Sequence, residues 1–158
     1  MASDDWYTPK YIFDALNVTF TLDVAAPLEG PRYVPAYHWY AAEGEHLEWD
    51  GLVWMNPPYG HQRQKHVWLD RFAKHGNGIA LMPDRTSAPW FQHFAPQMDA
   101  ILWINGKVKF EKPNGEVGNS PGNGSVLFAM GPVAVRAVRN SCLGFVTVAL
   151  GPESGKGG

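Results

Sequence analysis

The hydrophobic positions of this chain follow two patterns. Short continuous apolar runs bounded by turn residues predict buried strands, and apolar residues three or four positions apart predict helices. Strands are expected at 20–24, 51–55, 78–82, 100–104, 107–110, 126–130 and 145–150, and a further short strand is compatible with 33–40. Helices are expected at 8–17, 66–75 and 87–97. Strands and helices therefore alternate along most of the chain.

Turn and capping residues mark several ends of these elements. Thr8 before Pro9 is typical of a helix start, with the threonine as N-cap and the proline at the first helical position. Ser87 is expected to cap the helix at 87–97 in the same way. Gly76 is a candidate C-cap of the helix at 66–75. Pro83 is expected to end the strand at 78–82.

The alternation predicts an α/β fold with a mostly parallel sheet. The runs at 107–110 and 126–130 are joined by a loop rich in Gly, Asn and Pro, so an antiparallel edge hairpin is expected there. We expect one domain over residues 1–150 and a flexible tail over 151–158. Ligands of such sheets bind outside the carboxyl ends of the strands. Asp23, Asn56 and Pro83 all fall at such ends.

Composition excludes several classes of protein. Of 158 residues, 45% are hydrophobic and 13% aromatic, which is typical of a globular chain. No stretch is long and apolar enough for a membrane span, and the N-terminus lacks the features of a signal peptide. One cysteine, Cys142, allows neither an intramolecular disulfide nor a Cys-rich zinc site, and the histidines form no metal motif. We expect a cytoplasmic protein with no metal and no membrane partner.

The tetrapeptide Asn56-Pro57-Pro58-Tyr59 follows directly on the apolar run 51–55. Neither proline has an N–H and each fixes φ, so the chain leaves the predicted strand in a stiff, extended turn. An exocyclic amine on a planar ring has two N–H donors and a π-face. The Asn56 side-chain oxygen and the Pro57 carbonyl can accept those donors, and Tyr59 can stack on the ring. The motif resembles that of amino-methyltransferases that use S-adenosylmethionine, although a stiff loop with a buried tyrosine would look the same.

Four segments in order carry a more specific resemblance. They are Trp6-Tyr7-Thr8-Pro9, Leu22-Asp23-Val24-Ala25-Ala26, Trp54-Met55-Asn56-Pro57-Pro58-Tyr59 and Lys107-Val108-Lys109-Phe110. Together they resemble the phage-type DNA N6-adenine methyltransferase (Dam) family over about residues 6–130. The resemblance implies a Rossmann-like S-adenosylmethionine-dependent methyltransferase fold. It also implies transfer of a methyl group from S-adenosylmethionine to the N6 amine of adenine in DNA.

The resemblance implies roles for individual residues. The catalytic set is Asn56, Pro57, Pro58 and Tyr59. Asp23 is expected to receive the methionine ammonium of the cofactor, although a turn aspartate would have the same neighbours. The other expected cofactor residues are Trp6, Thr8, Pro9, Ala25, Glu45 and Asn56. Glu43 or Glu48 could replace Glu45 beside the adenine or ribose, and a solvated acidic loop is the alternative for all three.

Contacts to DNA must come from local features, because the formal net charge is −2. Lys107 and Lys109 alternate with apolar residues, so both would lie on one face of the predicted strand. The other candidates are His61, Arg63 and Lys65 after the motif, Arg85 at the rim, and Asn123, with Asn114 and Asn119, in the loop after the lysines. Each of these has a solvated surface position as its alternative.

Two other functions remain open from the sequence. The chain could be an amino-methyltransferase acting on cytosine N4, RNA or a protein glutamine, or a non-catalytic DNA-binding or cofactor-binding module derived from such an enzyme. No separate target-recognition domain is evident, so a very short site or relaxed adenine methylation is expected. Neither the recognition sequence nor the oligomeric state follows from these residues.

Overall fold

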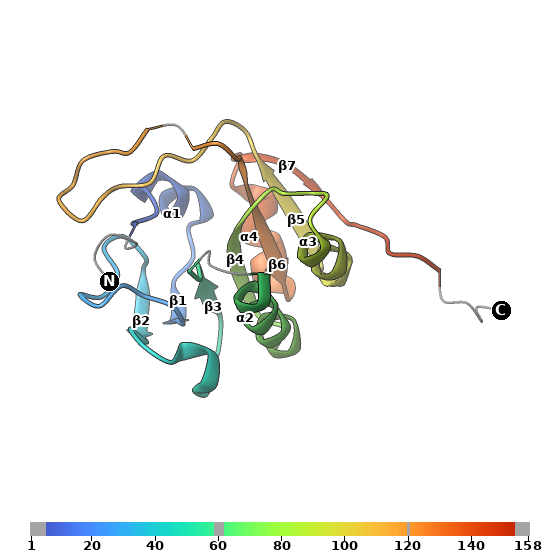
Figure 1. The fold of residues 1–158 in the computed structure, drawn as a ribbon, viewed down its shortest axis with the longest axis horizontal. Coiled ribbons are helices and arrows are strands. Elements are labelled where there is room, and N and C mark those ends of the chain that lie inside the picture. Colours follow the sequence, from blue (N-terminus) through green and yellow to red (C-terminus); the bar gives the residue numbers. More distant parts are fainter. Residues whose placement is uncertain (1–5, 59–61, 120, 154–158) are drawn as a thin grey trace.

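The computed structural model of the chain describes residues 6–58, 62–119 and 121–153. Within these ranges the strands form one sheet of seven (Figure 1). They are β1 (Phe20–Asp23), β2 (Ala36–Trp39), β3 (Val53–Met55), β4 (Gly78–Pro83), β5 (Ala100–Ile104), β6 (Ser125–Met130) and β7 (Gly144–Thr147). The helices are α1 (Lys10–Leu16), α2 (Gln62–His75), α3 (Pro89–Phe94) and α4 (Pro132–Asn140), with 3-10 turns η2 (Gly44–His46) and η3 (Ala95–Gln97).

The sheet has the order β2-β1-β3-β4-β6-β5-β7. Strands β2, β1, β3 and β4 pair in parallel, whereas β6 is antiparallel to both β4 and β5, and β7 is antiparallel to β5. Strands β1 to β5 therefore run one way, and β6 and β7 run the other way. This confirms a mixed α/β fold with a mostly parallel sheet.

The predicted antiparallel edge hairpin is wrong. Strand β6 lies inside the sheet, between β4 and β5, and residues 107–110 are not a strand. Both edges of β6 are already hydrogen-bonded, so no edge remains with which 107–110 could pair. The alternation in this segment instead reflects one-sided burial, because the Val108 side chain is fully buried while Lys107 and Lys109 are exposed.

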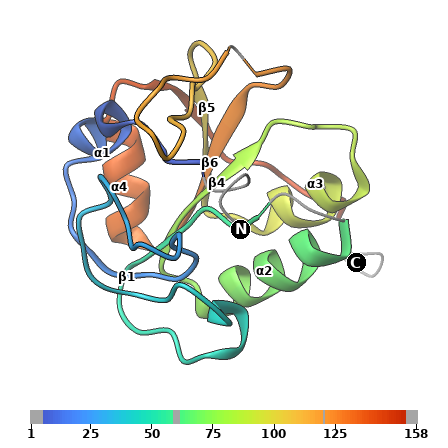
Figure 2. The ribbon, with the colours of Figure 1, turned by 60° about the vertical axis from the view of Figure 1, so that its left-hand side comes forward.

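Helices cover both faces of the sheet and make three layers (Figure 2). On one face α2 and α3 bury an aromatic-rich core that includes Trp68, Phe72 and Phe94. On the other face α1 and α4 pack through a second core that includes Phe13 and Val138. Burial of such side chains is the main favourable term in folding. None of the described helices combines the length and apolar character of a membrane span.

Several helix ends differ from the sequence prediction. Pro9, not Thr8, is the N-cap of α1, and α3 begins at Pro89 with Ala88 as its N-cap. Helix α2 begins at Gln62, earlier than predicted, and ends before Gly76, whose φ of 72° fits the predicted C-cap. Helix α4 was not predicted. The other predicted elements are present with small shifts at their ends.

Candidate functional site

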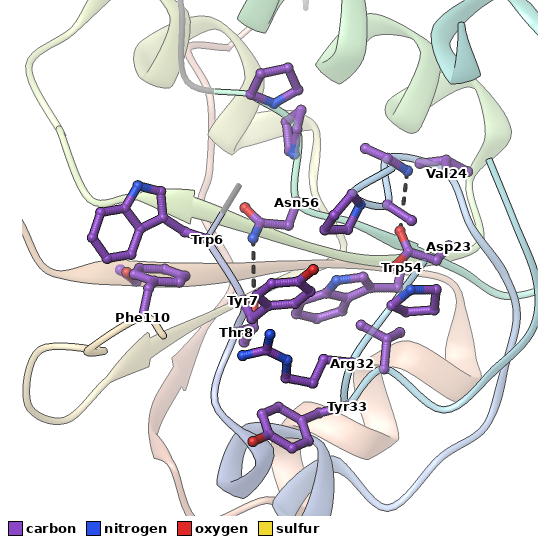
Figure 3. A pocket seen from close by; sticks show the side chains of 18 of the residues that line it. Trp6, Tyr7, Thr8, Asp23, Val24, Arg32, Tyr33, Trp54, Asn56 and Phe110 are labelled. Atoms are coloured by element: carbon purple, nitrogen blue, oxygen red, sulfur yellow. Dashed lines mark hydrogen bonds between the residues drawn. The ribbon is translucent and has the colours of Figure 1, made fainter. Parts of the chain in front are cut away.

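A pocket of about 990 Å³ opens at the carboxyl ends of β1, β3 and β4 (Figure 3). Its lining comes from the N-terminal segment, the loops after β1 and β2, the turn after β3, and the loop that precedes β6. The predicted site residues in this lining are Trp6, Thr8, Asp23, Ala25, Glu45, Asn56, Pro57, Pro58 and Asn123. The fold thus brings residues from all four segments that carry the resemblance into one cavity, with Phe110 from the fourth.

The order of strands fixes the order of groups across the pocket. Asp23 is the last residue of β1 and pairs with Trp54 of β3, two positions before Asn56. On the far side of β3, β4 ends at Pro83, which pairs with Ser125 at the start of β6. Asn56 therefore lies between the Asp23 end of the pocket and the end formed by Pro83 and Ser125.

The Asp23 carboxyl is almost completely buried, at 2% exposure. Burial raises its pKa to about 7, and a hydrogen bond from the Ala25 backbone N–H to Oδ1 (3.1 Å) opposes that rise. The backbone around it is held by Tyr40 N–H to the Asp23 carbonyl (2.9 Å) and Val24 N–H to the Trp54 carbonyl (3.1 Å). A carboxylate held in so dry a position is suited to receive a cationic group from a ligand.

The Asn56 side chain is oriented by Thr8. Its Nδ2 donates to the Thr8 Oγ1 at 3.2 Å, and Figure 3 shows the amide oxygen turned away from Thr8. Thr8 is buried, and this bond replaces the predicted N-cap contact. Pro57 is buried, whereas Pro58 is exposed at the pocket edge. Tyr59, the last residue of the motif, lies outside the described residues.

The 3-10 turn η2 forms another part of the lining. A Cβ at Gly44 would overlap the Val24 carbonyl oxygen, so only glycine lets the turn approach β1 this closely. The Arg71 guanidinium donates to the Glu45 carbonyl (2.9 Å) and fixes the turn against α2. Glu43 and Glu45 both line the pocket, and Glu48, the third candidate, is not among the described lining residues.

A cluster around Arg32 was not predicted from the sequence. Its guanidinium lies over the Tyr7 ring at 3.8 Å and donates to Glu111 Oε1 (3.2 Å). It also donates to the carbonyls of Lys112 (3.1 Å) and Pro113 (2.7 Å). Arg32 thereby joins the loop after β1 to the segment before β6. No local sequence signal could reveal this, because the partners are some eighty positions apart in the chain.

The residues predicted to contact DNA lie in different surroundings. Lys65 is only 8% exposed and lies 5.8 Å from the Trp90 ring centroid. Burial, and secondarily the nearby Arg85 charge, lowers the pKa of Lys65. Arg63 and Arg85 are exposed, and His61 lies outside the described residues.

Lys107 and Lys109 do not line the main pocket. They line a separate groove of about 290 Å³, with Pro9, Tyr11, Glu111 and Val117 as its other described walls. Asn119 and Asn123 line the main pocket from the loop before β6. Within the described residues, no group of three His, Cys, Asp or Glu side chains could hold a metal ion.

Comparison with known protein families identifies the family of this chain. The model of the family DNA N-6-adenine-methyltransferase (Dam) matches residues 1–144. Neither a curated protein nor a solved structure matches the chain. The family match confirms the resemblance drawn from the four short segments, and it covers α4 as well as the sheet up to the start of β7.

Proposed function

This chain belongs to the DNA N-6-adenine-methyltransferase (Dam) family, and we propose that it transfers a methyl group from S-adenosylmethionine to the N6 amine of adenine in DNA. One observation carries the proposal. A buried carboxylate, Asp23, and an oriented amide, Asn56, end neighbouring strands and line the same pocket. The first suits a cationic cofactor, and the second suits an exocyclic amine.

The residues present fit this cofactor. Asp23 would hold the methionine ammonium, because the ammonium would compensate a carboxylate that burial otherwise makes costly to ionise. Ala25 and Gly44 line the pocket near the end of β1 without bulky side chains, and Glu43 or Glu45 could accept hydrogen bonds from ribose or adenine. When bound, S-adenosylmethionine supplies an electrophilic methyl group. The cofactor is thus assigned to the Asp23 side of Asn56.

The role of Asn56 follows from its orientation. With one amide N–H donated to Thr8, the side-chain oxygen is available to accept a hydrogen bond from an N–H of the target amine. The Pro57 carbonyl is the second proposed acceptor. Fixed acceptors stabilise positive charge as it develops on the amine nitrogen, and they need no reorganisation during the reaction. Tyr59 is proposed to stack on the base, and extrusion of the base from the duplex costs a few kcal/mol.

Thr8 is expected to act through Asn56 and not through the cofactor. Thr8→Val keeps the shape of the side chain but removes the acceptor of the Asn56 N–H, so the amide can rotate. We expect kcat to fall about tenfold, the equivalent of one hydrogen bond, with the affinity for S-adenosylmethionine unchanged. Thr8→Ser should restore kcat. A loss of cofactor affinity with unchanged kcat would instead place Thr8 on the cofactor, as the sequence suggested.

Analysis of labelled nucleosides tests the proposed function. Unmethylated DNA is incubated with the protein and S-adenosylmethionine carrying a labelled methyl group and is then digested to nucleosides. Label on N6-methyldeoxyadenosine is the expected result. Label on cytosine N4, or on RNA or a protein glutamine offered in parallel, would favour the alternative amino-methyltransferase. Absence of both cofactor binding and transfer would favour a non-catalytic module.

Specificity is expected to be low. The loop before β6 brings Asn119 and Asn123 into the pocket, but few other described side chains there could reach base edges. Each good base contact adds only about 1–3 kcal/mol of discrimination. We expect a short site or relaxed adenine methylation, with binding that weakens steeply as salt rises because phosphate contacts dominate. Mapping of methylated adenines on a long DNA checks this, and a single long recognition sequence would contradict it.

A further inference from the structure

Two aromatic side chains, Trp6 and Phe110, lie in the pocket on the side of Asn56 away from Asp23 (Figure 3). Trp6 is 41% exposed, an unusual degree for a tryptophan that lines a cavity. An accessible aromatic surface inside a pocket is a stacking surface for a planar ligand.

The local backbone directs these side chains toward Asn56. Tyr7 and Glu111 form an antiparallel bridge, with N–H to carbonyl distances of 2.8 and 2.9 Å. Side chains alternate about such a bridge, so Trp6, Thr8 and Phe110 share one face and Tyr7 shares the other with Glu111. The face of Thr8 is the one that meets Asn56, because the two side chains are hydrogen-bonded.

Gly118 lies next to the Trp6 ring. Its N–H donates to the Phe110 carbonyl (2.9 Å), which holds it beside the aromatic pair. A Cβ at Gly118 would lie 2.8 Å from the nearest atom of the Trp6 ring and 3.3 Å from the Phe110 carbonyl oxygen. The ring therefore packs against bare backbone, and a side chain at this position would push it away.

On the basis of the proposed function, we infer that Trp6 and Phe110 form a wall on which the extruded nucleobase stacks, in addition to the stacking proposed for Tyr59. With the cofactor on the Asp23 side, a base whose amine meets Asn56 must extend to the other side, toward Pro83 and Ser125. The Asn56 amide oxygen is turned toward the side where Trp6 lies (Figure 3). This assignment moves Trp6 from the cofactor, where the resemblance placed it, to the substrate.

Substitution of Trp6 separates the two assignments. Base–aromatic stacking is worth about 1–3 kcal/mol per base, so Trp6→Ala is expected to lower kcat/KM for DNA by about 5- to 150-fold at saturating S-adenosylmethionine. The Kd for S-adenosylmethionine, measured by calorimetry, should change less than about twofold. Trp6→Phe should retain most of the activity. Trp39→Ala is the matched control, because Trp39 is 49% exposed on the edge strand β2.

Gly118→Ala tests the same wall without removing an aromatic ring. The added methyl group should displace the Trp6 ring and lower kcat/KM for DNA in the same direction as Trp6→Ala. The Kd for S-adenosylmethionine should again stay unchanged. If Trp6→Ala weakens cofactor binding and leaves kcat/KM for DNA at saturating cofactor unaltered, Trp6 belongs to the cofactor site and the inference is wrong.

A binding measurement keeps this inference separate from the proposed reaction. A single-stranded oligonucleotide with adenines, and a matched one with abasic positions in their place, are titrated while tryptophan fluorescence is recorded. We expect adenine-dependent quenching in the wild type and in Trp39→Ala, and its loss in Trp6→Phe, which still binds. If no nucleoside becomes labelled but this quenching is present, the proposed function fails and the stacking wall stands. Absence of adenine-dependent quenching overturns the stacking wall.

Discussion

Replacing Asn56 with alanine is expected to reduce the rate of methyl transfer by about a hundredfold or more. The substitution removes the oriented amide oxygen that is proposed to accept a hydrogen bond from an N–H of the target amine. Asp23 and the turn η2 are untouched, so the Kd for S-adenosylmethionine should remain close to that of the wild type. Transfer is measured by incorporation of labelled methyl groups at saturating cofactor, and cofactor binding is measured by calorimetry.

A graded series makes the Asn56 result specific. Asn56→Asp keeps two oxygen acceptors but cannot donate to Thr8, so it should retain more activity than Asn56→Ala. In this variant the Thr8 hydroxyl can donate to the carboxylate and hold it in place. Thermal unfolding of each variant shows that the fold is retained. Turnover near the wild-type level in Asn56→Ala would contradict the proposed mechanism.

Continuous apolar runs were the most reliable sequence signal. Strands β3, β4, β5 and β6 lie inside the sheet with helices on both faces, so nearly every side chain must be apolar. The segment 107–110 has the alternation of a half-buried strand, but pairing depends on a free neighbouring edge. That edge is set by the order of distant strands and cannot be read from four residues. For residues 107–110, the predicted alternation of buried and exposed side chains is therefore correct, whereas the predicted strand is wrong.

The prediction of helix ends was wrong where a capping side chain makes a tertiary contact instead. Thr8 before Pro9 has the residue types of an N-cap, yet its hydroxyl is used by Asn56, 48 positions along the chain. Helix α4 was missed although Gly131 and Pro132 mark its start, because its buried face consists largely of small residues such as Ala134 and Ala137. Small side chains give a weak periodic signal even when they pack closely.

Some residues of the candidate site could be placed from the sequence, and others could not. Asp23 and Asn56 could be placed in one crevice from the sequence, because both follow apolar runs that end at the same edge of a parallel sheet. The contacts of Arg32 and the packing of Gly118 against Trp6 could not be predicted from the sequence, because each joins segments that are distant in the chain. Local patterns thus locate groups at strand ends, whereas the direction in which a side chain points depends on the completed fold.

The second large effect is expected at Asp23. Asp23→Asn removes the charge proposed to receive the cofactor ammonium while keeping the size of the side chain. Loss of one partner from a buried charge pair costs about 2–5 kcal/mol, so we expect the Kd for S-adenosylmethionine to rise at least about thirtyfold. Asp50→Asn is the matched control, because Asp50 is exposed and does not line this pocket. An unchanged Kd in Asp23→Asn would make Asp23 a turn residue only.

The same carboxyl gives a pH dependence with a defined sign. Burial raises the pKa of Asp23 from 3.8 to about 7 in the folded protein, so between these values the folded state binds a proton that the unfolded state has released. The free energy of unfolding should therefore fall as pH rises from about 4 to about 7, by up to about 4 kcal/mol, and level off above. Asp23→Asn should lose this dependence and be more stable than the wild type at pH 8 without cofactor.

Cofactor binding should show the opposite trend with pH. The ammonium favours the ionised carboxylate, so below pH 7 binding must displace a proton from Asp23, and affinity should fall by up to about tenfold per pH unit. The Kd of Asp23→Asn for S-adenosylmethionine should be high and independent of pH over the same range. Calorimetric titrations at several pH values, paired with denaturant unfolding of the free protein, measure both trends. If the wild type loses stability between pH 4 and 7 while its cofactor affinity stays constant, the carboxyl is buried as inferred but does not hold the cofactor.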